Sequence, residues 1–184
     1  MTITAAILET ALNKLGHKFF KNGDYNLNII GIRTSSTGNK VTNAFDDYIA
    51  VAFKVDGVWG VRVWPATVDN GGGTARVVAG QYLGSHAIGL HQGKYEALRQ
   101  VGPLKIERDY TRNGIYDATK IETGVFGINI HKAGANSVQV NNWSEGCWVF
   151  KKSADFAAFM LIAKKAAALH GNRFTSTLIE SNNL

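Results

Sequence analysis

The residue of this chain best suited to nucleophilic chemistry is its single cysteine, Cys147. It ends the segment Trp-Ser-Glu-Gly-Cys, directly after Gly146, and lies sixteen positions after His131. A thiol becomes a nucleophile when an imidazole takes its proton, and a preceding glycine lets amide N–H groups approach a developing oxyanion. We therefore expect His131 to be the base and to hold the pKa of Cys147 below the ~8.5 of free cysteine. Ser144 adds a polar group beside the site. The alternative is a packed cysteine near a hydrogen-bonded histidine.

The residues that lead to His131 predict a strand with two different faces. Over positions 125–131, Gly127, Asn129 and His131 alternate with a phenylalanine and two isoleucines. Successive side chains of a strand point to opposite faces, so the apolar set is expected in the core. The small, polar set is then expected to line a cleft, where Asn129 contacts the substrate.

Aromatic and imidazole side chains complete the expected cleft. Trp143 and Trp148 flank the cysteine. Tryptophan rings stack on sugars, although they more often pack in a core. His91 is expected at the edge of the same cleft. We predict that these three residues bind substrate.

Positions 127–148 resemble the catalytic signature of the L,D-transpeptidase (YkuD-type) family, which is a histidine at a strand end, a loop, and then Ser/Thr-x-Gly-Cys. In this resemblance His131 matches the general base and Cys147 the nucleophile, while Ser144 and Gly146 match the remaining fixed positions. The resemblance implies a β-rich domain with peripheral helices. It also implies a Cys–His pair that acts on the stem peptides of peptidoglycan.

Two positions differ from the family pattern. Val149 stands where the family usually has an arginine, and Lys132 stands where it has a glycine. Both differences affect the binding of a substrate carboxylate and the shape of the loop. In addition, the run from Gly89 to Asp109 resembles proteins of phage lysis and tail genes, which implies a role in degrading cell walls.

Two other groups of polar residues were weighed as metal sites. His86 and His91 lie five positions apart, a spacing that matches no zinc motif. The run from Asp109 to Asp117 resembles a calcium loop, but Lys120 occupies the place of the bidentate carboxylate. We expect no metal and no cofactor, and weak calcium binding by this loop stays open.

Composition favours one soluble catalytic domain that spans positions 1–184. Hydrophobic residues make up 45% of the chain, and no apolar run is long enough to insert into a membrane. The net charge of +6 suits an anionic cell wall, and the weak clustering of Lys and Arg argues against nucleic acid. The first twenty residues lack the pattern of a secretion signal. We expect a monomer made in the host cytoplasm that reaches the wall after lysis-pore release or on a virion.

Two helices and several short strands are expected to position these residues in a single α+β domain, a mixed sheet or sandwich. The helices span 4–15 and 154–170, and the second begins at Ser153 as N-cap and ends at Gly171. Asp56-Gly57 predicts a two-residue hairpin turn. The other predicted features are a strand ending at Pro65, short strands over 75–78, 86–90, 104–108 and 174–179, a loop over 31–43, and a helical turn over 95–100.

The combined prediction is a peptidoglycan-cleaving cysteine peptidase that forms a thioester acyl-enzyme and releases it with water. One alternative is a transpeptidase that transfers the acyl group to an amine and so cross-links peptidoglycan. Another is a wall- or glycan-binding module without catalysis. A nucleic-acid-binding protein is the third alternative.

Overall fold

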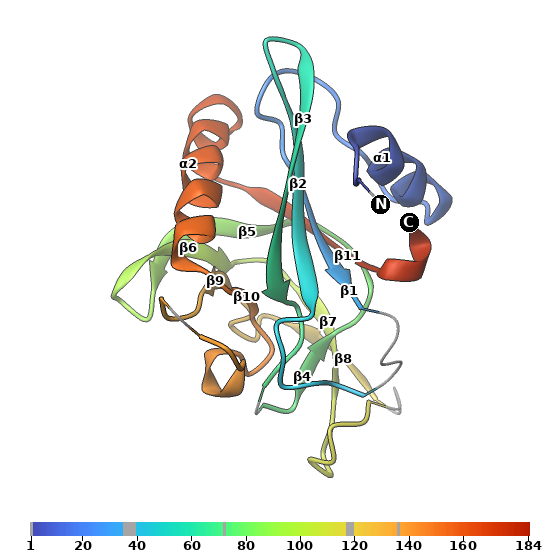
Figure 1. The fold of residues 1–184 in the computed structure, drawn as a ribbon, viewed down its shortest axis with the longest axis vertical. Helices are drawn as coiled ribbons and strands as arrows, with labels where there is room; N and C mark the ends of the chain where they lie inside the picture. Colours follow the sequence, from blue (N-terminus) through green and yellow to red (C-terminus); the bar gives the residue numbers. More distant parts are fainter. Residues whose placement is uncertain (1, 35–39, 72, 117–119, 136) are drawn as a thin grey trace.

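In a computed structural model that describes residues 2–34, 40–71, 73–116, 120–135 and 137–184, the chain forms a closed β-barrel flanked by two α-helices (Figure 1). A small three-stranded sheet lies at one end of the barrel, and the two termini lie close together beside the first helix. The predicted class, an α+β, β-rich fold with an N-terminal helix and a long helix near the C-terminus, is confirmed. No helix in the described part of the chain is long and apolar enough to cross a bilayer.

The barrel closes in the order β1-β11-β5-β6-β9-β10-β3-β2. The pairs β1·β11 and β9·β10 are parallel, and the other neighbours are antiparallel. The barrel strands are β1 (Asn28–Arg33), β2 (Asp47–Val55), β3 (Val58–Thr67), β5 (Gly80–His91), β6 (Tyr95–Gln100), β9 (Ile130–Lys132), β10 (Trp148–Phe150) and β11 (Phe174–Glu180). The small sheet has the order β4-β7-β8, with β4 (Ala75–Val77), β7 (Leu104–Arg108) and β8 (Ile121–Gly124).

Local signals place several of these elements correctly. Asp56 and Gly57 both have positive φ, 51° and 77°, and they join β2 to β3 as predicted. Helix α1 (Ala5–Lys14) begins at Thr4, whose hydroxyl accepts a hydrogen bond from the amide of Ile7. Helix α2 (Ser153–His170) ends at Gly171, also as predicted. Short 3-10 helices lie at η2 (Asn141–Trp143), between β9 and β10, and at η3 (Ser181–Asn183), after β11.

The predicted loop over 31–43 is wrong at its start, because 31–33 belong to the buried strand β1. The glycine that suggested a loop serves packing instead. A Cβ added to Gly31 would lie 2.9 Å from Cη2 of Trp148 and 3.0 Å from Cγ1 of Val68. The absence of a side chain at position 31 therefore makes room for the Trp148 ring inside the barrel.

Three further expectations about elements are wrong. The segment 95–100 is strand β6, which returns from β5 through a tight turn where Gln92 and Gly93 have positive φ. Strand β3 does not end at Pro65 but continues to Thr67, and Lys151 donates its amide hydrogen to the Pro65 carbonyl. The N-cap of α2 is Lys152, which makes no side-chain capping bond, and Ser153 is already helical.

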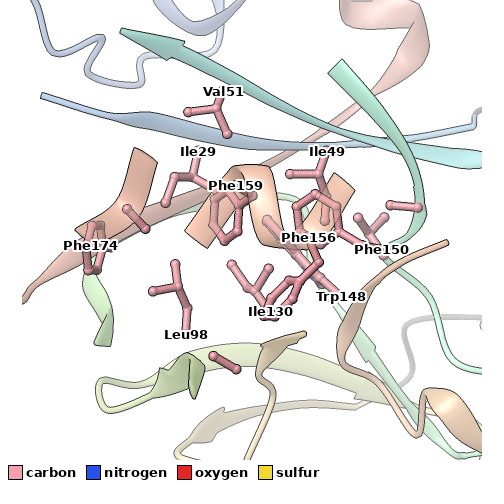
Figure 2. Close-up of a cluster of buried hydrophobic side chains, with 14 of the residues drawn as sticks. Ile29, Ile49, Val51, Leu98, Ile130, Trp148, Phe150, Phe156, Phe159 and Phe174 are labelled. Atoms are coloured by element: carbon pink, nitrogen blue, oxygen red, sulfur yellow. The ribbon is translucent and has the colours of Figure 1, made fainter. Parts of the chain in front are cut away.

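The main core fills the barrel and is covered by α2 (Figure 2). Phe150 is central, because its ring lies 5.7 Å from that of Phe156 and 5.0 Å from that of Phe159, both on α2. A second core forms where α1 covers the outer face of β1 and β2, with Leu8 and Leu12 fully buried. Strand β1 is thus buried on both faces.

Candidate active site

Cys147, His131 and His91 line one pocket of about 290 Å³. The pocket lies where the end of β5, the start of β6, strand β9 and the segment before β10 meet. Its remaining lining residues are Gln92, Lys94, Tyr95, Asn142, Trp143 and Glu145. The sequence analysis placed the first three residues at one cleft, and the structure brings all of them together.

The parallel pairing of β9 and β10 places the cysteine near the histidine. Trp148 lies opposite Ile130 in the register, and its amide donates to the carbonyl of Asn129 at 2.9 Å. Cys147, one position earlier, therefore lies beside Asn129, two residues before His131. Parallel neighbours need a long connection, and the chain between Lys132 and Trp148 supplies it.

Buried surroundings keep the Cys147 thiol protonated. Burial, and to a smaller extent the nearby Glu145 carboxylate, raise the pKa of the thiol to about 11. The Asn129 amide opposes this change by donating to Sγ at 3.3 Å. The predicted pKa below the value of free cysteine is therefore wrong, because desolvation of the sulfur outweighs the contacts that favour a thiolate.

His131 is buried and neutral. Its Nδ1 lies 3.0 Å from the carbonyl oxygen of Lys132, and a carbonyl can only accept, so the ring proton is on Nδ1. The lone pair is therefore on Nε2. Burial and, to a smaller extent, the neighbouring His91 lower the pKa of His131 to about 4, although the hydrogen bond to the Lys132 carbonyl opposes this change. No hydrogen bond joins the His131 ring to the Cys147 sulfur, both of which are described, so the two groups share a pocket without forming an ion pair.

Asn129 connects the cysteine, His91 and strand β6. Its amide holds the sulfur, and its side-chain oxygen accepts from the amide of Gln100 at 2.9 Å. Its side-chain nitrogen lies 3.1 Å from Nδ1 of His91. Asn129 is not among the pocket-lining residues. The structure thus gives this side chain contacts within the protein in place of the predicted contact with substrate.

The two tryptophans that flank the cysteine lie in different environments. Trp143 is 44% exposed and lines the pocket, as predicted. Trp148 is 2% exposed and points into the barrel core (Figure 2), so its predicted contact with substrate is wrong. The reason is the strand geometry, in which neighbouring side chains point to opposite faces. Cys147 faces the pocket and Trp148 faces the core.

Ser144 and Gly146 shape the turn before the cysteine. Ser144 is fully buried, and its hydroxyl lies 2.8 Å from the Asp69 carbonyl and 2.7 Å from the Cys147 carbonyl. The Gly146 amide donates to the Ser144 hydroxyl at 3.1 Å and is therefore already engaged. The predicted oxyanion donor from the backbone near Gly146 is therefore not the amide of Gly146 itself. The amide of Cys147 itself has no hydrogen-bond partner among the described residues.

Sequence reasoning missed Gln100, which shapes the segment before β9. Its side-chain oxygen accepts from the amides of Phe126 and Ile128, each at 2.9 Å, and its nitrogen donates to the carbonyls of Gly102 and Gly124. These bonds replace strand pairing. The predicted strand over 125–131 is therefore wrong before Ile130, although Ile128 and Ile130 are buried as expected. No local pattern marks a glutamine for this role.

The other histidine and aspartate groups lie outside the pocket. His86 is fully buried, where its Nε2 donates to the Ile128 carbonyl and its Nδ1 accepts from Ser85. The Asp109 carboxylate accepts from the Thr111 hydroxyl and the Gly114 amide. Asp117, the other end of the proposed calcium loop, lies outside the described residues. Among the described residues, no group of three His, Cys, Asp or Glu side chains is placed to hold a metal.

Comparison of the chain with models of protein families, with curated proteins and with solved structures gives no match. The fold and the pocket therefore define an α+β barrel with a candidate Cys–His site. The resemblance to L,D-transpeptidases stays a prediction that rests on positions 127–148.

Proposed function

We propose that this protein is a cysteine-dependent peptidoglycan hydrolase that cleaves stem peptides, as the resemblance of its motif to L,D-transpeptidases suggests. The observation that supports this proposal most is the pocket itself. It brings the only thiol of the chain together with a buried histidine whose Nε2 carries a lone pair. Acyl transfer of this kind needs a nucleophile and a general base, and a thiol beside a neutral imidazole supplies both.

In the proposed reaction, proton transfer accompanies the attack. Nε2 of His131 takes the thiol proton while Sγ of Cys147 bonds to the carbonyl carbon, and the carbonyl π electrons move to oxygen. The Cys147 amide donates to this oxyanion. The tetrahedral intermediate then expels the amine, which receives the proton from His131, and a thioester remains. Water, deprotonated by the same histidine, hydrolyses the thioester and restores the thiol.

The walls of the pocket support a peptide of mixed charge as substrate. Lys94 and Glu145 place both signs of charge on its lining, and Trp143 adds an exposed ring. Lys132 lies with Nζ 5.1 Å from the ring centre of Tyr95. Lys94 lines the pocket, whereas Lys132 lies outside the lining residues, beside Tyr95. Val149, which replaces the arginine of the family pattern, is fully buried. Lys94 and Lys132 are therefore the candidates to hold a substrate carboxylate.

One observation favours the alternative of a binding module without catalysis. Cys147 is half-buried, the pKa of its thiol is raised, and no hydrogen bond connects the sulfur to His131 within the described structure. A packed cysteine has the same properties. The two functions differ in what they do to the wall, because a binding module retains peptidoglycan without releasing fragments.

Digestion of purified peptidoglycan followed by mass spectrometry of the released fragments tests the proposal. We expect wild type to release fragments, and Cys147→Ala and Cys147→Ser to release none while their unfolding midpoints stay near that of wild type. His131→Gln should also be inactive. The matched control is His170→Gln, which alters an exposed histidine at the end of α2 and should keep full activity. An active Cys147→Ala, or a wild type that binds the wall without cleaving it, refutes the proposal.

The same assay separates hydrolysis from transfer. A transpeptidase must hold an acceptor amine against the thioester and exclude water. We expect cross-linked muropeptides to decrease and monomers to accumulate. If dimers grow from added tetrapeptide monomers, the protein is a cross-linking enzyme instead.

A further inference from the structure

His91 is stacked on the proposed base. Its ring lies 4.2 Å from the His131 ring, centre to centre, with 19° between the planes. It ends strand β5, whereas His131 lies in β9, so the stack joins two parts of the barrel. Both rings line the pocket that contains Cys147.

The two imidazoles are fixed in opposite tautomers. The side-chain nitrogen of Asn129 can only donate, so Nδ1 of His91, 3.1 Å away, accepts. The proton of a neutral His91 is therefore on Nε2. In His131 the Lys132 carbonyl holds the proton on Nδ1, which leaves the lone pair on Nε2. One ring thus offers a donor at Nε2 and the other an acceptor.

Neither Nε2 atom has a hydrogen-bond partner among the described residues. Both Nδ1 atoms and Asn129 are engaged, since Asn129 uses its amide on Cys147 and its side chain on His91 and on the Gln100 amide. The stack therefore leaves one N–H and one lone pair without partners among the described residues, on two rings that line the pocket. A partly buried N–H without a partner is costly unless water or a ligand accepts from it.

The attack by the thiol creates a need for such a donor. A tetrahedral intermediate is commonly stabilised by more than one hydrogen bond to its oxygen. The Gly146 amide is engaged with the Ser144 hydroxyl, so on this side the Cys147 amide remains. The backbone on this side therefore supplies one hydrogen-bond donor to the oxyanion, and a second donor has to come from another group.

We propose that Nε2–H of His91 donates a hydrogen bond to the oxyanion formed when Cys147 attacks an acyl substrate. This inference rests on the proposed nucleophilic role of Cys147. His91 keeps its proton throughout, while the proton of the thiol passes to Nε2 of His131 and then to the leaving group. The pair therefore divides the work, with His131 transferring the proton and His91 stabilising the negative oxygen.

The surroundings of His91 keep it uncharged and its tautomer fixed. Burial lowers its pKa, and the positive charges of Arg99 and Lys94 lower it further. The other titratable groups that face it are His131 in the stack and Tyr95, whose ring lies 5.5 Å away. Glu145 and Cys147 share the pocket lining. A neutral ring is a donor that does not attract the thiol proton away from His131.

Three substitutions distinguish a donor from a structural residue. His91→Gln places an amide nitrogen near the position of Nε2, His91→Asn places its amide near Nδ1, and His91→Phe keeps only the stacking ring. A structural role through Asn129 favours the asparagine variant. A donor role favours the glutamine variant. The two roles therefore predict opposite orders of activity.

Two reactions of Cys147 at pH 8 supply the readout. Acylation by p-nitrophenyl acetate passes through an oxyanion. It is monitored by the absorbance of the released p-nitrophenolate and by the mass of the acetylated protein. Alkylation by iodoacetamide forms no oxyanion and serves as the control reaction. We expect acylation to fall roughly 10²-fold in His91→Asn and His91→Phe and to stay near wild type in His91→Gln. Alkylation should change little in all three.

Each outcome has a defined meaning. If His91→Asn is acylated as fast as His91→Gln, or if acylation and alkylation fall together, His91 is not the donor. If wild type is alkylated but not acylated, the nucleophilic role of Cys147 fails and this inference fails with it. If acylation behaves as expected but peptidoglycan is not cleaved, only the proposed substrate is wrong.

Discussion

Adding one methyl group at Gly146 tests how tightly the turn before the cysteine is built. A Cβ at this position would lie 2.9 Å from Cδ1 of Ile128 and 3.1 Å from both the Cβ and the carbonyl oxygen of Ala75. The backbone φ of Gly146 is +133°, a conformation that other residues rarely adopt. Gly146→Ala therefore combines backbone strain with overpacking. Gly127→Ala is the matched control, because Gly127 has φ +79° and nothing within 4 Å of an added Cβ.

The two costs can be estimated separately. An unfavourable φ costs about 1–3 kcal/mol, and overpacking a filled site costs about 1–3 kcal/mol. We expect Gly146→Ala to lower the free energy of unfolding by about 2–6 kcal/mol. Gly127→Ala has only the strain and should lose about 1–2 kcal/mol. The Ala75 carbonyl yields poorly, because it is part of the backbone and accepts a hydrogen bond from the Asn70 side chain at 2.9 Å.

Urea unfolding at pH 7 measures both variants on one scale, and digestion of peptidoglycan measures their activity. Gly146→Ala should also lose activity, because any relief of the contacts moves Cys147 relative to His131. Equal destabilisation of Gly146→Ala and Gly127→Ala would refute the packing argument and leave backbone strain as the whole effect.

Three other measurements test the charges of the fold. Because the pKa of Cys147 is raised to about 11, its rate of alkylation should rise about tenfold per pH unit from pH 7 towards pH 10. A rate that stops rising near pH 8 would contradict the raised pKa. The Asp69 carboxylate lies 2.8 Å from the buried guanidinium of Arg33, so Asp69→Asn should lower the free energy of unfolding, measured in urea, by about 3–5 kcal/mol. A loss below about 1 kcal/mol would show that this ion pair contributes little to stability. Burial lowers the pKa of His86 and of His131 from 6.5 to about 4. The unfolded chain therefore binds protons below pH 6.5 that the native state does not. The free energy of unfolding should fall from pH 6.5 towards pH 4 by roughly 1.4 kcal/mol per pH unit for each histidine. Urea midpoints that stay constant over this range would contradict the lowered pKa values of these histidines.

The parts of the fold that sequence could predict are those set by local chemistry. Asp56-Gly57 specifies its turn because both residues tolerate positive φ, and Gly171 ends α2 for the same reason. The predictions of secondary structure are wrong where contacts with residues far away in the sequence determine the local conformation. Gly31 looks like a loop residue until the Trp148 ring is seen against it. The segment 95–100 contains good helix formers, yet its pairing with β5 makes it a strand.

The candidate site shows the same division. The spacing of His131 and Cys147, together with the family resemblance, predicted that the two residues share a cleft, and the parallel strands β9 and β10 bring both to one pocket. Their protonation could not be predicted, since it depends on how deeply each group is buried. The roles of Asn129 and Gln100 depend on hydrogen bonds to segments far away in the chain. Trp148 was misassigned because the position of a residue beside a cysteine does not reveal which face of the strand it occupies.

The thiol of Cys147 and the two imidazoles are neutral, and this changes which experiment can reveal the chemistry of the site. The Lys132 carbonyl and the Asn129 side chain set the tautomers of the two histidines, and no carboxylate hydrogen-bonds to either ring within the described structure. Charge therefore develops only when a substrate carbonyl is in place and the proton of Cys147 moves to His131 during the attack. An alkylating reagent needs a thiolate that already exists, so slow alkylation at neutral pH is expected from a catalytic and from a packed cysteine alike. Acylation by an ester distinguishes them, because its transition state recruits the base and the oxyanion donors that alkylation does not use.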